Sequence, residues 1–83
     1  MVRTSFDGQT IAKVLRRHNF QPVGRTGSHL KLRWENHNTD EVRIVTVPMK
    51  PADDIPQGTM RSIADQAGAH DFEEFCQWID RNR

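Results

Sequence analysis

The sequence predicts an α+β fold of order α-β-β-β-α, with a three-stranded antiparallel sheet, helices packed on one face of it, and an extra C-terminal helix. Three observations predict it. Apolar residues recur at helical spacing near both ends, two strand patterns flank a short polar turn in the middle, and prolines separate the strands from the second helix. The 83 residues suit one domain, 1–83, with a core over about 6–68 and a helical extension over about 71–82.

The first helix is expected to begin after Asp7, whose carboxylate can accept hydrogen bonds from the first free amides. Phe6 and Ile11 occupy the two positions of a hydrophobic staple. Helical spacing then places one set of side chains on a single face: Ile11, Val14, Leu15 and His18. Asn19 should end the helix because asparagine tolerates a positive φ, and Phe20 should fold back onto it.

The middle of the chain predicts the sheet. Residues 21–25 are interrupted by a proline and a glycine, so they form an edge strand at best, and residues 26–28 form a turn. Residues 29–35 alternate in polarity and residues 41–47 are rich in β-branched side chains, so these two strands pair antiparallel across the polar turn 36–40. The alternation puts His29, Lys31 and Arg33 on one face and Leu30, Leu32 and Trp34 on the other, toward the core.

The C-terminal third predicts a loop and two helices. Residues 48–57 hold three prolines and should form the loop. The second helix should begin near Gly58 and end before Gly68, a suitable residue for a left-handed stop. Its apolar stripe consists of Met60, Ile63, Ala64 and Ala67. Asp71, with Glu74 three residues later, is the expected cap of the last helix. The buried stripe of that helix consists of Phe72, Phe75, Cys76 and Ile79.

The charges are unevenly distributed, although the net charge is only +1. Residues 1–50 carry nine Lys or Arg against four acids, whereas residues 51–83 carry three Arg against seven acids. This asymmetry favours one face for a polyanion and another that is solvated or meets a different partner. A single cysteine permits neither an internal disulfide nor a zinc framework. No apolar run resembles a signal peptide or a membrane span, so we expect a cytoplasmic protein without membrane contact.

The stretch from Gly27 to Arg33 is the strongest candidate for chemistry. An imidazole beside two permanent cations on one strand face is a poor metal site but a good place for a phosphodiester, so we expect no metal there. Imidazole as a chemical group exchanges protons near neutral pH, so His29 can remove the 2′-OH proton of RNA or protonate the leaving 5′-oxygen. Lys31 and Arg33 could hold the phosphate, and the Ser28 hydroxyl and the amides of the Gly27 turn could add donors. Cleavage would leave a 2′,3′-cyclic phosphate and a 5′-hydroxyl.

The other reactive or aromatic side chains are assigned structural roles. His18 ends a helix, where an imidazolium suits the helix dipole, and His37 and His70 should face solvent. Cys76 lies on an apolar stripe and is expected to be buried and inert. Trp34 shares the leucine face and should pack in the core. Trp78 either lines the last helix or faces a partner.

Several segments, taken in their order along the chain, resemble the HicA family of toxins. They are an amphipathic first helix, Gly27-Ser28-His29 opening a strand, Val45-Thr46-Val47-Pro48 closing another, and Gly58-Thr59-Met60-Arg61-Ser62-Ile63. The similarity runs from about Phe6 to Gly68. It implies a fold like that of double-stranded-RNA-binding domains (dsRBD-like), and mRNA interferase activity without a cofactor. It also implies a catalytic histidine that maps onto His29, and a HicB-like antitoxin that covers the active surface.

Such a domain also uses its first helix against RNA. The predicted RNA-binding set is therefore Gly27, Ser28, Lys31, Arg33, Arg25, Lys13, Arg16 and Arg17. The acidic segment 71–83 departs from the family and would serve antitoxin contact, self-association or solubility. Two alternatives stay open: a non-catalytic RNA-binding module that uses the same basic face, and a protein-interaction domain whose RNA surface is vestigial.

Overall fold

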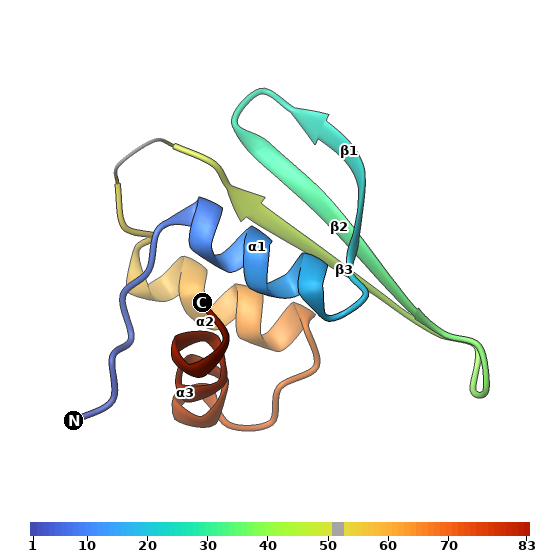
Figure 1. Cartoon of the computed structure of the whole chain (residues 1–83). Helices are drawn as coiled ribbons and strands as arrows, with labels where there is room; N and C mark the ends of the chain where they lie inside the picture. The colour runs from blue at the N-terminus through green and yellow to red at the C-terminus, as the bar shows by residue number, and fades with distance from the viewer. Residues whose placement is uncertain (51–52) are drawn as a thin grey trace.

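The computed structural model describes residues 1–50 and 53–83 and has the predicted α+β order. The elements are α1 (Gly8–Arg17), β1 (Gln21–Thr26), β2 (His29–Asn36), β3 (Glu41–Pro48), α2 (Gln57–Gln66) and α3 (Phe72–Asn82), as Figure 1 shows. The strands form one antiparallel sheet in the order β1-β2-β3. No helix in the described part of the chain is both long and apolar enough to cross a membrane.

The signals that bound α1 act as predicted. The Asp7 carboxylate accepts a hydrogen bond from the Thr10 amide at 3.2 Å, and Phe6 and Ile11 are both buried as a staple requires. Asn19 has a φ of +72°. That left-handed residue turns the chain back, so that Phe20 is buried and its amide donates to the carbonyl of the last helical turn.

The short turns between the strands set the register of the sheet. A two-residue turn, Gly27 and Ser28, joins β1 to β2, and Gly27 takes a φ of +58° that favours glycine. Thr26 therefore pairs with His29. Along β3, the pairing runs from His29 with Pro48 at one end to Asn36 with Glu41 at the other. The pairing of β1 is irregular between residues 22 and 24, and β1 lies at an edge of the sheet, as predicted.

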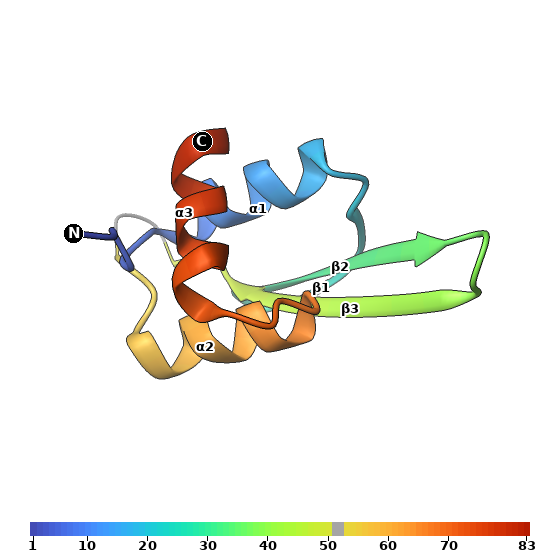
Figure 2. The same ribbon diagram turned by 90° about the horizontal axis from the view of Figure 1, so that it is seen from below.

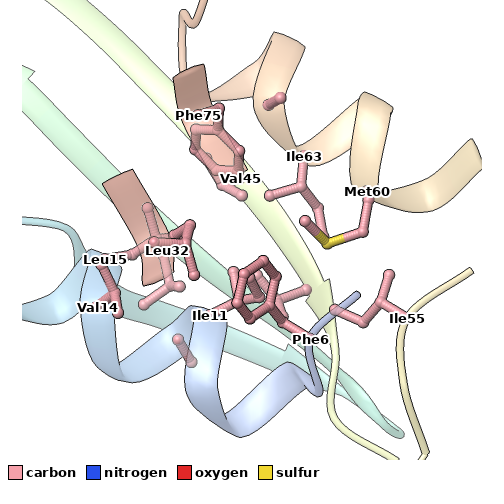
Figure 3. Close-up of a cluster of buried hydrophobic side chains, with 14 of the residues drawn as sticks. Phe6, Ile11, Val14, Leu15, Leu32, Val45, Ile55, Met60, Ile63 and Phe75 are labelled. Carbon is pink, nitrogen blue, oxygen red and sulfur yellow. The ribbon is translucent and has the colours of Figure 1, made fainter. Parts of the chain in front are cut away.

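The core lies between the sheet and the helices. Leu32, Val45 and Val47 are fully buried on one face of the sheet, and the apolar sides of the three helices cover them (Figure 3). The helix α1 contacts all three strands, whereas α2 lies along β3. The side chain of Gln66 on α2 accepts a hydrogen bond from the Thr46 backbone amide at 2.9 Å. This contact covers part of a strand edge that would otherwise be unpaired.

The second helix begins one residue before the predicted Gly58, after Pro56. The predicted loop, 48–57, includes residues 51–52, which lie outside the described residues, and its first residue, Pro48, is the last of β3. Gly68 follows α2 with a φ of +86°, which confirms the predicted stop.

The third helix begins as predicted, because the Asp71 carboxylate accepts a hydrogen bond from the Glu74 amide at 2.9 Å. Its buried residues are Phe75, Cys76 and Ile79. Phe72 was expected among them but is only partly buried, because its ring lies under the guanidinium of Arg61, 4.3 Å from the ring centre, rather than inside the core. Figure 2 shows α3 running from beside α2 to beside α1.

Candidate active site

The face of the sheet that points away from the helices carries the predicted site. We call it the outer sheet face. The leucines of β2 face the core, so period-two alternation places the intervening side chains on the opposite face, together with their cross-strand partners. It is formed by His29, Lys31, Arg33 and Glu35 of β2, by Gln21, Gly24 and Thr26 of β1, and by Val42, Ile44, Thr46 and Pro48 of β3. The predicted grouping of His29, Lys31 and Arg33 on one face is confirmed.

His29 is exposed and stands at the first position of β2, between Thr26 and Pro48 on the neighbouring strands. Its ring makes no hydrogen bond or ion pair with any residue that the structure describes. The backbone beneath it is firmly held, because the Ser28 carbonyl accepts a hydrogen bond from the Met49 amide. An exposed imidazole on a fixed backbone leaves both ring nitrogens free for a substrate.

The start of α1 also supports this end of the sheet. A Cβ on Gly8 would overlap the Pro48 carbonyl oxygen, so only glycine lets α1 approach β3 this closely. Pro48 is in turn the direct cross-strand partner of His29. The position of the imidazole therefore depends on a helix packed on the far side of the sheet.

Lys31 and Arg33 differ, although both lie on the outer sheet face. Lys31 is exposed, and its cross-strand partner on β1 is Gly24, so no side chain of β1 lies opposite it. Arg33 is already engaged, because its Nη1 donates to Glu35 Oε2 at 2.8 Å. This hydrogen bond and the guanidinium charge lower the pKa of Glu35 below its ordinary value. Among the described residues, Lys31 is thus the unpaired cation next to His29 on this face, whereas Arg33 is paired with Glu35.

Gly27 and Ser28 form the turn directly before His29. The remaining cations of the predicted RNA-binding set lie away from it. Lys13, Arg16 and Arg17 are exposed on the solvent side of α1, and the apolar stripe of α1 packs against the helix-facing side of the sheet. These cations therefore point away from the sheet, on the opposite side of the molecule from His29. Arg25 pairs with Leu30, which assigns it to the helix-facing side, and its Nε donates to the Gly27 carbonyl at 3.2 Å.

The remaining histidines lie elsewhere. His18 caps the C-terminal end of α1, where its Nδ1 donates to the Val14 carbonyl at 2.8 Å, so its predicted structural role is confirmed. His37 lies in the turn between β2 and β3 with 86% of its side chain exposed, and that turn projects away from the helices (Figure 1). His70 is exposed in the connection between α2 and α3. In the described chain, none of the three is adjacent to His29.

The other structural assignments agree with the prediction. Trp34 is half-buried and stacks on Phe20 with ring centres 6.3 Å apart, on the helix-facing side. Cys76 is buried, and burial raises the pKa of its thiol, which suits an inert side chain. Trp78 lines α3 and contacts the His18 ring. Across residues 1–50 and 53–83, no three His, Cys, Asp or Glu side chains are grouped so that they could hold a metal ion.

Two hydroxyl side chains near His29 were missed by the sequence reasoning. Thr26 is its cross-strand partner, and Thr46 is the partner of Lys31 on the other side. Directly opposed residues have Cβ atoms roughly 5 Å apart, so both hydroxyls border the space between His29 and Lys31. A signal for Thr26 was present, because a two-residue turn at 27–28 makes residues 26 and 29 partners.

Comparisons with known proteins identify one family. A model of one protein family, described as the HicA toxin of bacterial toxin–antitoxin systems, matches residues 8–69. The match begins at the first residue of α1 and ends before α3. Searches of curated proteins and of solved structures gave no match.

Proposed function

The chain belongs to the HicA toxin family of bacterial toxin–antitoxin systems, and from this premise we propose that it is an mRNA interferase, an endoribonuclease with His29 as its general acid or base. The observation that carries the proposal is the exposed imidazole of His29 beside the exposed ammonium of Lys31, neither of which has a side-chain partner in the described part of the chain. The helices leave this sheet face uncovered, so an extended RNA strand can reach both groups. We expect this action in the cytoplasm, where mRNA is found.

The proposed reaction is attack of a ribose 2′-oxygen on the adjacent phosphorus. The P–O2′ bond forms and the P–O5′ bond breaks, which gives a 2′,3′-cyclic phosphate and a 5′-hydroxyl. Neutral His29 takes the 2′-OH proton, and the 5′-oxygen receives a proton from water. The ammonium of Lys31 and the hydroxyls of Thr26 and Thr46 stabilise the negative charge that grows on the phosphate oxygens.

A single-histidine scheme is preferred because the other histidines lie away from this face. Glu35 is the only carboxylate among the described outer-face residues, and it is six positions along β2 from His29. At roughly 3.3 Å per residue, the separation approaches 20 Å, too far for a shared proton transfer. Proton exchange with solvent is easy at an exposed site, so this scheme requires no second protein group.

The family also implies a cognate antitoxin, and we infer a HicB-like protein that covers the outer sheet face. Val42 and Ile44 support this inference, because they are 45% and 43% exposed on the same face as His29. Exposed β-branched side chains beside charged ones suit a protein interface better than a phosphate backbone. Covering them would also exclude RNA from His29.

The test is RNA cleavage by the purified protein in the presence of a metal chelator. Wild type and a His37→Ala control should cleave RNA and leave cyclic phosphate ends. His29→Ala should lose roughly 10²–10⁴-fold in rate, the usual contribution of general acid–base catalysis. The control removes an exposed histidine from the same hairpin, so it separates loss of the catalytic imidazole from loss of any imidazole.

Four results would count against the proposal. Equal cleavage by wild type and His29→Ala would remove His29 from the reaction, and a requirement for added metal would overturn the metal-free scheme. Salt-sensitive RNA binding without cleavage would instead indicate an RNA-binding module, because phosphate neutralisation alone gives that behaviour. An absence of RNA affinity at low salt, together with a stable antitoxin complex, would indicate a protein-interaction domain.

A further inference from the structure

A hollow lies away from the outer sheet face, where the end of α1, the connection from α2 to α3, and α3 itself meet. Its volume is about 380 Å³, and we call it the α3 groove. Its apolar lining consists of Leu15, Phe20, Ala67, Ala69, Phe75 and Trp78. Its polar lining consists of His18, His70, Asp71 and Glu74. None of these residues belongs to the proposed catalytic site.

The groove exists because small residues follow α2 and large ones face them from α3. Gly68 turns the chain with a φ of +86°, and Ala67 and Ala69 on either side leave the space open. Buried Phe75 and half-buried Trp78 face this space, with the Trp78 ring 4.5 Å from the ring of His18. One wall of the groove is formed by side chains of α3, and α3 lies outside the residues that match the family.

The charge of the rim indicates what the groove can hold. Neither Asp71 nor Glu74 forms an ion pair within the described chain, and both are exposed. Arg43 packs against Gly68, but its guanidinium pairs with Glu41. An acidic rim repels RNA phosphates and attracts Lys or Arg. The apolar lining needs an apolar side chain, so the matching occupant is a peptide segment with an apolar residue next to a basic one.

We propose that the α3 groove binds such a segment of the cognate antitoxin, at a second contact separate from the face that carries His29. The proposal rests on the proposed function only in taking the antitoxin as the partner. Because α3 lies outside the matched residues 8–69, the family match does not itself imply a contact at this groove. It would let the toxin select its own antitoxin over those of related pairs through apolar fit and opposite charge.

The test measures binding of toxin variants to the protein encoded by the adjacent reading frame, the candidate antitoxin, by titration calorimetry. Glu74→Lys reverses the charge of the rim, and Ala69→Trp fills the hollow without removing a core side chain. The matched control is Glu73→Lys, which makes the same change in the same first turn of α3 but outside the groove. Circular dichroism and RNA cleavage by each free variant should match wild type.

Glu74→Lys and Ala69→Trp should each weaken antitoxin binding by on the order of tenfold, with little change for Glu73→Lys. If Glu74→Lys and Glu73→Lys weaken antitoxin binding equally, the effect comes from long-range charge and not from the groove, which would overturn the proposal. Unchanged antitoxin binding by Ala69→Trp would also overturn the proposal, as would the absence of any complex. A further contrary result would be self-association of the free toxin, if Glu74→Lys abolishes that self-association. The cleavage assay on the same proteins reports separately on the proposed ribonuclease activity.

Discussion

The two faces of β2 differ in whether their side chains contact other parts of the protein. On the helix-facing side, Leu32 is 0% exposed and packed on every side by the core. On the outer face, its neighbour Lys31 is exposed and free of protein partners among the described residues. The even-numbered residues of this strand therefore contribute to stability, and its odd-numbered residues carry the proposed chemistry. Substitutions at adjacent positions should separate the two contributions.

The largest expected effect is on the helix-facing side. Leu32→Ala should lower the free energy of unfolding by about 2–5 kcal/mol, because it removes buried contacts and leaves a cavity. Lys31→Ala, one residue away, should change it by no more than about 0.5 kcal/mol. Urea unfolding followed by circular dichroism measures both. Similar losses of unfolding free energy for the two variants would contradict this difference between the buried face and the exposed face of β2.

A smaller effect should distinguish the two cations of the outer sheet face, Lys31 and Arg33. Lys31→Gln should weaken RNA binding at all sequences alike and lower the slope of log affinity against log salt by about one. Arg33→Gln should lower that slope less, because the guanidinium of Arg33 is already held by Glu35. Fluorescence anisotropy over a salt series, in a His29→Ala background that prevents cleavage, compares the two. A larger loss of slope for Arg33→Gln would show that its ion pair opens when RNA binds.

The sequence was sufficient for the features that depend on local pattern. Alternation in residues 29–35 separated the two faces of β2, and the caps at Asp7 and Asp71 and the left-handed stops at Asn19 and Gly68 were all found. Each of these depends on residues within one or two turns of the chain. Local chemistry therefore decides them before tertiary packing begins.

The errors and omissions concern contacts between elements. The contact of the α1 cations with RNA stays a prediction, but they do not share a face with His29. The apolar surfaces of α1 and the sheet meet in one core, so their polar surfaces point in opposite directions. The sequence and a two-layer fold are sufficient to predict this opposition. The pairing of Arg33 with Glu35 and the contact of Arg61 with Phe72 were different, because they depend on side-chain rotamers that no spacing fixes.

The smallest expected effect tests the pairing on the outer face through pH. Arg33 lowers the pKa of Glu35 in the folded protein, so the folded state favours the carboxylate more than the unfolded state does. The stability from this pair is present at neutral pH and is lost as pH falls through the lowered pKa. Unfolding free energies of wild type and Arg33→Gln should therefore differ at pH 7 and converge in acid. The NMR titration midpoint of Glu35 should rise in Arg33→Gln, and a midpoint that does not move would mean that the exposed pair is open in solution. In that case Arg33, like Lys31, would be free for phosphate, and the outer sheet face would offer RNA two cations beside His29 instead of one.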